Sequence, residues 1–222
     1  MGTTIALTAS DGVSIQAYRA EPTGTPRGGI VVLQEIFGVN PHIRSVADRY
    51  AEQGYLAIAP ALFDRVTPGL ELGYDQDGMT TGIATQKQTV PADTLKDVAA
   101  AVALAASAGK VGIVGYCWGG TLAYAAACQL DGVAAAVGYY GGGIASMLDK
   151  KPRVPVMLHF GQHDDHIPMT SVAAIRAALP DVPVYDYPAG HGFNCDARGS
   201  YDKASADQAL SRTLPFFKKY VG

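Results

Sequence analysis

The chain lacks the features that would direct it to a membrane or to nucleic acid. Its 222 residues contain no apolar run long enough to span a bilayer. Lysine and arginine form no cluster, and the formal net charge is only -3. Residues 1–10 lack the basic start and long apolar core of a secretory signal, so we expect no leader peptide. We therefore expect no nucleic-acid partner and no membrane partner.

Cysteine is also scarce. The three cysteines have no regular spacing, which argues against a disulfide framework or a zinc ribbon. A working thiol survives best in a reducing compartment, so we expect a cytoplasmic protein. The chain is 48% hydrophobic and 17% charged, without repeats, linkers or low-complexity segments, and its length suits a single α/β domain over residues 1–222.

Apolar runs alternate with helical patterns along the chain. Asp11-Gly12 between short alternating runs at 5–7 and 13–18 predicts a β-hairpin. Later strands are predicted at 29–35, 55–59, 111–116, 133–140, 154–160 and 182–187, and helices at 41–53, 91–107, from 118, 169–179 and 201–220. Residues 62–90 show no clear period and are predicted to be irregular, as in segments that cover a site.

This order of elements predicts the α/β class. Continuous apolar runs are typical of strands that are buried on both faces. Alternation of strands and helices then predicts a mostly parallel, doubly wound sheet with helices on both faces, and the N-terminal hairpin forms its antiparallel edge.

The most informative stretch is Gly115-Tyr116-Cys117-Trp118-Gly119-Gly120. It follows an apolar run and precedes an alanine-rich segment, which is the order strand, turn, helix. The stretch matches G-x-S-x-G, the nucleophile elbow of α/β-hydrolases, with cysteine in place of serine. Its glycines leave room for a strained turn. The pattern predicts that Cys117 is a nucleophile, and a small buried core cysteine is the alternative.

A thiol nucleophile needs a base, and the base needs a group that orients it. In α/β-hydrolases the acid and then the histidine follow the nucleophile along the chain. Asp164 lies just beyond the predicted strand 154–160, and His191 lies on a glycine-flanked loop after the strand 182–187. We expect Asp164 to fix the tautomer of His191, whose other ring nitrogen faces Cys117, and Asp165 is the alternative acid.

Four motifs together resemble the dienelactone hydrolase family. They are the G-Y-C-W-G-G elbow, V-V-L-Q-E-I-F-G at 31–38, G-x-x-D-x-x-[IV]-P at 161–168 and A-G-H-G-F at 189–193. The segment R-T-L-P-F-F at 212–217 also resembles the terminal helix of that family, so the similarity covers nearly the whole chain. It implies an α/β-hydrolase fold and hydrolysis of a lactone or carboxylic ester, through a thioester acyl-enzyme.

The resemblance also implies a role for each matching position. The catalytic residues are Cys117 as nucleophile, Asp164 as acid, His191 as base and Glu35 as the carboxylate that holds the resting thiol and helps to activate it, while the backbone N–H groups of Ile36 and Trp118 form the oxyanion hole. This acyl-transfer cycle requires no metal and no organic cofactor. Trp118 either lines the pocket or packs the elbow helix.

The chain departs from the family in its arginines. Well-studied members hold the substrate carboxylate with one arginine before the elbow and one after the catalytic histidine, but residues 66–151 contain none. Arg198, three positions later than expected, is our substrate-binding candidate, and Arg65 is the alternative. Phe37 and Phe193 are predicted either to line an apolar substrate pocket or to pack in the core.

A metal site is the alternative interpretation of a histidine-rich segment. His159, His163 and His166 lie close to Asp164 and Asp165. The histidines fall on a strand end and a loop, so they do not share one helical face as in H-E-x-x-H. We therefore expect no metal.

Two other functions are consistent with the same residues. One is a redox-active thiol protein, in which Cys117 pairs with Cys195, while Cys128 packs in the core. The other is a non-catalytic small-molecule binder on the same scaffold. For the hydrolase, we expect a small-molecule lactone or ester as partner, and a monomer or weak homodimer.

Overall fold

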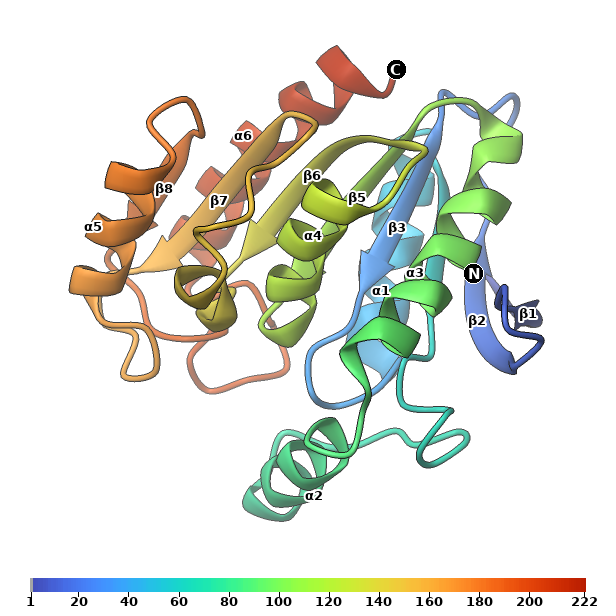
Figure 1. The fold of residues 1–222 in the computed structure, drawn as a ribbon, viewed down its shortest axis with the longest axis horizontal. Coiled ribbons are helices and arrows are strands. Elements are labelled where there is room, and N and C mark those ends of the chain that lie inside the picture. Colours follow the sequence, from blue (N-terminus) through green and yellow to red (C-terminus); the bar gives the residue numbers. More distant parts are fainter. Residues whose placement is uncertain (1) are drawn as a thin grey trace.

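A computed structural model describes residues 2–222, and its centre is an eight-stranded sheet in the order β1-β2-β4-β3-β5-β6-β7-β8 (Figure 1). The strands are β1 (Thr3–Thr8), β2 (Ser14–Ala20), β3 (Gly29–Leu33), β4 (Leu56–Pro60), β5 (Val111–Tyr116), β6 (Val133–Tyr139), β7 (Val156–Gly161) and β8 (Val184–Tyr187). Strands β4, β3, β5, β6, β7 and β8 are parallel, whereas β1 and β2 pair antiparallel, and β2 also runs antiparallel to β4. The predicted fold class and its antiparallel N-terminal hairpin are confirmed.

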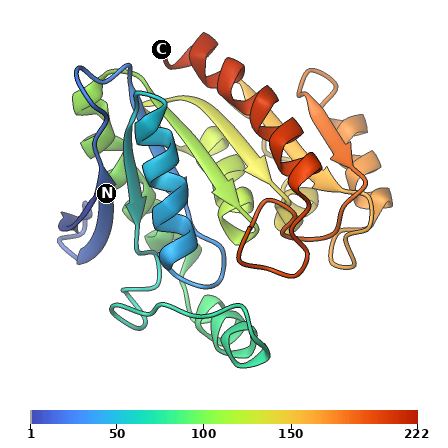
Figure 2. The ribbon, with the colours of Figure 1, turned by 180° about the vertical axis from the view of Figure 1, so that it is seen from behind.

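Helices cover both faces of the sheet. The helices are α1 (Pro41–Glu52), α2 (Gln76–Gln86), α3 (Pro91–Ala105), α4 (Trp118–Gln129), α5 (Met169–Ala178) and α6 (Lys203–Tyr220), with short 3-10 turns η1 (Ala106–Ala108) and η2 (Gly142–Ser146). Helices α3, α4 and α5 lie on one face (Figure 1), and α1 and α6 lie on the other (Figure 2). Tyr50 of α1 packs edge-on against Phe217 of α6, with ring centroids 6.0 Å apart. The central strands are therefore buried on both sides, as their apolar runs predict.

Helix α2 corrects the prediction that residues 62–90 are irregular. Its eleven residues, Q-D-G-M-T-T-G-I-A-T-Q, are rich in glycine and threonine, which lower helix propensity and hide the helix from periodicity. Asp75 caps the helix by accepting a hydrogen bond from the backbone N–H of Gly78 at 2.8 Å. A Cβ on Gly82 would lie 2.1 Å from the carbonyl oxygen of Ile36, so glycine lets α2 pack over the segment after β3.

The parallel strands bring distant loops to one edge of the sheet. Glu35 follows β3, Cys117 follows β5, Asp164 follows β7 and His191 follows β8. In open α/β sheets this carboxyl edge is where ligands bind. We therefore expect the functional site at the carboxyl ends of the parallel strands. None of the helices within residues 2–222 is long and apolar enough to cross a membrane.

Candidate active site

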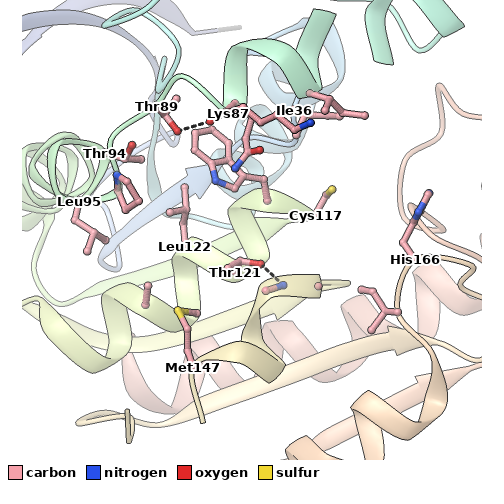
Figure 3. Close-up of a pocket in the computed structure, with 18 of the residues that line it drawn as sticks. Ile36, Lys87, Thr89, Thr94, Leu95, Cys117, Thr121, Leu122, Met147 and His166 are labelled. Carbon is pink, nitrogen blue, oxygen red and sulfur yellow. Dashed lines mark hydrogen bonds between the residues drawn. The ribbon is translucent and has the colours of Figure 1, made fainter. Parts of the chain in front are cut away.

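Cys117 lies at the sharp turn between β5 and α4. Its φ of 55° and ψ of -115° form a strained backbone conformation for a residue with a side chain. A Cβ on Gly115 would lie 1.9 Å from the carbonyl oxygen of Gly119, so glycine is needed for the strand and the helix to approach this closely. The turn leaves the thiol half-buried and places it at the wall of a large cavity (Figure 3).

The structure brings the predicted acid and base to this thiol. The Nε2 atom of His191 lies 3.1 Å from the Sγ atom of Cys117. The Nδ1 atom of His191 lies 2.7 Å from Oδ2 of Asp164. Asp164 is buried, and its Oδ1 atom accepts hydrogen bonds from the backbone N–H groups of His166 and Ile167. These two hydrogen bonds therefore hold the Asp164 carboxylate in the position from which it contacts the imidazole.

His191 is poised to carry a positive charge. Burial disfavours the imidazolium, but the hydrogen bonds to Asp164 and Cys117 outweigh the burial and raise the pKa of His191 to about 10. The arrangement can thus hold a proton between a carboxylate and a sulfur. Such a linked thiol, imidazole and carboxylate can deliver a nucleophile and return a proton to a leaving group.

Two backbone N–H groups near the thiol are free to bind an oxyanion. Around the elbow, the N–H of Cys117 donates to Tyr139, and the N–H of Gly119 donates to Gln34. Within residues 2–222, the N–H groups of Ile36 and Trp118 donate no hydrogen bond to another protein group. The chain between β3 and α1 is held by Gln34, whose side-chain amide donates to the carbonyl of Glu35 and whose Oε1 accepts from the N–H of Leu62.

Glu35 is buried and forms an ion pair with Arg198. The Nη1 atom of Arg198 lies 3.2 Å from Oε1 of Glu35, while Oε2 has no hydrogen-bond partner within residues 2–222. The guanidinium lies over the rings of Phe37 and Tyr74, 5.6 and 5.8 Å from their centroids. Burial lowers the pKa of Arg198, but the negative charge of Glu35 raises it above its usual value. A buried carboxylate therefore holds the guanidinium of Arg198.

The cavity beside Cys117 has a volume of about 740 Å³. Its lining includes Ile36, Phe37, Trp118, His191 and Arg198. Trp118 was predicted either to line the pocket or to pack the elbow helix. It lines the cavity and also stacks on Phe63, with ring centroids 5.3 Å apart.

Phe193 corrects the expectation that it lines the pocket. It is fully buried and packs against three core tyrosines, Tyr139, Tyr140 and Tyr187. The sequence position of Phe193, two residues after His191, does not indicate whether its side chain points into the pocket or into the core. Tertiary packing determines this.

The alternative acid, Asp165, and the alternative substrate-binding arginine, Arg65, make no hydrogen-bond contact with the thiol of Cys117. Asp165 is exposed and turned to solvent. Arg65 is paired with Asp97 and Asp11, so its guanidinium is occupied away from the thiol.

The histidine-rich segment does not form the metal cluster considered above. Both ring nitrogens of His159 are engaged, one with the Tyr187 hydroxyl at 2.7 Å and one with the Thr213 hydroxyl at 3.1 Å. His163 is exposed, and the ring of His166 packs edge-on against His191 with centroids 5.2 Å apart. Each histidine therefore has a separate environment.

Three other buried residues, one of them Glu35, place possible metal-binding atoms close together. Donor atoms of Glu35, His42 and Cys195 lie within 4.8 Å of one another, and all three residues are buried. The three cysteines are all free, so Cys195 is not bonded to Cys117. Burial, with the neighbouring charge of Glu35, raises the pKa of the Cys195 thiol to about 12, which keeps it protonated and unreactive.

Sequence reasoning did not identify the contacts that support the site. His42 of α1 holds Asp196 through its Nδ1 atom at 2.8 Å, which ties the loop that carries Arg198 to the helix. Tyr140 has a φ of 38°, and its ring lies 5.1 Å from that of His191. These partners are separated by up to 154 residues, so no local pattern could have found them.

Comparisons with known proteins identify the family of this chain. The sequence profile of the Dienelactone hydrolase family matches residues 15–221. A carboxymethylenebutenolidase from Pseudomonas putida is 35% identical over 226 aligned residues, which cover 93% of this chain and 95% of that protein. A Synechocystis protein provisionally named a carboxymethylenebutenolidase is 36% identical, covering 97% of this chain and 96% of its own. The solved structure of a Klebsiella pneumoniae protein, provisionally named a dienelactone hydrolase, gives a TM-score of 0.83 at 32% identity and covers 98% of this chain and 100% of that one.

The parallel sheet, its two helical layers and the strand–turn–helix at Cys117 define an α/β-hydrolase. The chain belongs to the dienelactone hydrolase family, a family of hydrolases that act on lactones and esters.

Proposed function

We propose that the enzyme hydrolyses a carboxylic ester or lactone through a thioester on Cys117. The observation that carries this proposal is the hydrogen-bonded series from Cys117 Sγ through both ring nitrogens of His191 to Asp164. Hydrogen bonds to Asp164 and Cys117 raise the pKa of His191 to about 10, so the imidazole is a base strong enough to accept the thiol proton. His191 would thus take the proton of Cys117 and leave the thiolate beside an imidazolium.

The reaction proceeds in two acyl-transfer steps. The Cys117 thiolate attacks the ester carbonyl carbon, and the negative charge that develops on the carbonyl oxygen is stabilised by the N–H groups of Ile36 and Trp118. Each such donor is typically worth about 3–4 kcal/mol in the transition state. The carbon–oxygen bond to the leaving group then breaks as the imidazolium of His191 gives the leaving oxygen its proton.

Deacylation uses the same residues in reverse. Neutral His191 takes a proton from water, the hydroxide attacks the thioester carbon, and the acid product leaves as the thiolate re-forms with its imidazolium partner. Asp164 holds the imidazole tautomer throughout. Neither step needs a metal ion or an organic cofactor.

Glu35 and Arg198 would tune this cycle and hold the substrate. We propose that Arg198 binds a carboxylate on the substrate, which would compete with Glu35 for the guanidinium. The negative charge of Glu35 opposes a second negative charge beside it, so Glu35 would keep the thiol neutral until substrate binds. An identical pH profile of thiol alkylation in wild type and Glu35→Gln would remove Glu35 from this role.

The partner of the enzyme is thus a small molecule, and we place the reaction in the cytoplasm. The free state of the three cysteines suits a reducing compartment. We propose that the enzyme acts as a monomer or a weak homodimer.

Steady-state hydrolysis of an aryl acetate by wild type and by Cys117→Ala tests the proposal. We expect the variant to lose more than about 10³-fold in kcat/KM, as for other nucleophile removals. Cys128→Ala is the matched control, because Cys128 lies on α4 outside the series of hydrogen bonds. Equal rates for wild type and Cys117→Ala would contradict the proposal, and peroxide turnover without ester turnover would favour a redox thiol instead.

A further inference from the structure

The cavity follows the whole length of α4. The α4 residues that line it are Trp118, Thr121, Leu122, Ala125 and Gln129. Their spacing of three or four places them on one face of the helix. A span of eleven residues at the rise of an α-helix corresponds to about 16 Å. The space beside Cys117 is therefore a long groove along the helix rather than a round pocket at the thiol.

The walls of this groove are mainly apolar, although Lys87, Thr89 and Thr94 also line it. Met79 and Ile83 of α2 and Leu95 of α3 contribute one side, and Met147 and Gly143 contribute the other. In Figure 3, Leu122, Leu95 and Met147 surround the space that extends from Cys117. Such a surface binds hydrocarbon rather than polar groups.

Small side chains keep the groove open. Ala125 lines it midway along α4, and Gly142 and Gly143 line it at η2. The hydroxyl of Thr121 accepts a hydrogen bond from the N–H of Gly143 at 3.0 Å, which fixes the distance between α4 and η2 (Figure 3). The protein's own packing therefore shapes the groove.

The far end of the groove is open and polar. Gln129 and Lys150 line it there, and both are exposed. The segment after η2 is held against the second half of α4, because the Tyr124 hydroxyl donates to the carbonyl of Lys150 at 2.7 Å. A bound chain would thus run from the thiol over apolar walls toward solvent.

The catalytic groups set the direction of the substrate. His191 must reach the leaving oxygen, so the alcohol part of an ester lies on the side of Nε2. In Figure 3, His166, which packs against His191, lies on one side of Cys117, and Leu122 and Leu95 lie on the other. The acyl part, which stays bonded to Sγ, is directed along α4.

From these observations, and resting on the ester hydrolysis proposed above, we propose that the groove is an acyl-chain site and that the enzyme prefers esters of medium-chain or longer acids. A length of about 16 Å matches an extended acyl group of roughly ten or more chain atoms. A lactone ring alone would leave most of the 740 Å³ unfilled.

The test is the dependence of kcat/KM on chain length for p-nitrophenyl esters from acetate to dodecanoate. We expect kcat/KM to rise at least about twofold per methylene up to roughly ten carbons, since each buried methylene adds to binding. Acetate esters of alcohols of matching length should show no such rise. A gain with alcohol length in place of acyl length would overturn the proposal.

Two variants test how far the acyl chain of the substrate extends along α4. Ala125→Phe obstructs the groove midway, and Gln129→Trp obstructs its outer end, one helical turn further on. We expect both to lower the decanoate-to-acetate ratio of kcat/KM, with the cut-off in Ala125→Phe about four carbons shorter, because one turn advances about 5.4 Å. Gln129→Trp keeps the test decisive if Ala125→Phe fails to fold, because position 129 is exposed.

Ala173→Phe is the matched control, because Ala173 is an exposed residue of α5 that does not line the groove. It should leave the ratio unchanged. A flat chain-length profile in an enzyme that hydrolyses the acetate would overturn the acyl-chain site and leave the proposed hydrolysis intact. An absence of hydrolysis with every ester would overturn both.

Discussion

Asp164 and Asp165 are neighbours in the chain, yet they have different surroundings. Asp164 is buried and contacts His191, whereas Asp165 is exposed. The G-x-x-D spacing favours Asp164, and the turn after β7 explains why, since two backbone N–H groups bind its Oδ1 atom. Which of the two aspartates reaches His191 therefore depends on the hydrogen bonds of the turn as well as on strand β7 before it.

Replacing each aspartate in turn separates their roles. Asp164→Asn should lower kcat by about 10⁴-fold, because the imidazole loses the partner that fixes its tautomer. Asp165→Asn should stay within about twofold of wild type in the same ester assay. A small effect of Asp164→Asn would contradict the assignment of Asp164 as the orienting acid.

His159 gives a prediction about stability rather than activity. Burial, with a smaller contribution from Arg212, lowers the pKa of His159 to about 3. Between about pH 6.5 and pH 3 the unfolded chain binds a proton at this residue that the folded chain does not, so falling pH favours unfolding. The free energy of unfolding should fall in this window by up to about 1.4 kcal/mol per pH unit from this residue.

Urea unfolding over this pH range, compared between wild type and His159→Gln, isolates that contribution. The variant should show the shallower dependence on pH, because glutamine does not titrate. His163→Gln, at an exposed histidine, should keep the slope of wild type. Parallel curves for wild type and His159→Gln would rule out a neutral buried His159.

At the level of elements, α2 packs the long segment before α3 against the peptide of Ile36, whose N–H is the proposed oxyanion donor. Gly82 contacts the carbonyl of Ile36, and Gly78, Gly82 and Thr85 are the buried residues of the helix. The helix was missed from sequence because its glycines lower helix propensity, although Gly82 is there for close packing. The other helices have alanine-rich or amphipathic segments, which is why their periodicity identifies them.

Substituting Gly82 tests this packing. A Cβ there would lie 2.1 Å from the oxygen of Ile36, so Gly82→Ala should displace either α2 or the peptide that offers the Ile36 N–H. We expect kcat for an ester to fall at least about tenfold, since the proposed oxyanion donor is disturbed. Gly73→Ala, where the nearest atom would be 3.9 Å away, should retain activity. Equal kcat in the two variants would show that α2 does not position the donor.

At the level of the whole molecule, most of the architecture follows from the sequence. Continuous apolar runs predict the buried parallel strands, and Asp11-Gly12 predicts the hairpin between β1 and β2. The order nucleophile, acid and histidine predicts which loops meet at the C-terminal edge, where the structure joins Cys117, His191 and Asp164 by hydrogen bonds. These features are readable because they depend on local pattern and on the topology of parallel sheets.

The features that the sequence could not supply depend on contacts between distant segments. The link between His42 and Asp196 spans 154 positions, and the ion pair of Glu35 with Arg198 spans 163. The burial of Phe193 and the length of the groove along α4 likewise follow from packing of several elements. Local spacing contains no information about such partners.

One long-range cluster gives a prediction for the stability of the whole fold. Arg65, after β4, donates two hydrogen bonds of 2.8 Å to the buried Asp97 of α3 and also reaches Asp11 in the hairpin turn. Burial raises the pKa of Asp97, so the carboxylate depends on this guanidinium for its charge. Arg65→Ala should lower the free energy of unfolding by about 3–5 kcal/mol, because it leaves a buried carboxylate without its partner.

Denaturant unfolding provides the comparison. Arg153→Ala removes a surface pair with the exposed Asp131 and should change the free energy of unfolding by less than about 1 kcal/mol. Similar losses in the two variants would show that Arg65 does not join these elements energetically.

The most direct measurement is mass spectrometry of the wild-type enzyme quenched in acid within its first turnover of an aryl ester. We predict one acyl group per protein, located by peptide mapping on Cys117 and released by hydroxylamine as expected for a thioester. An acyl group on another residue, or turnover with Cys117 unmodified at every quench time, would contradict it.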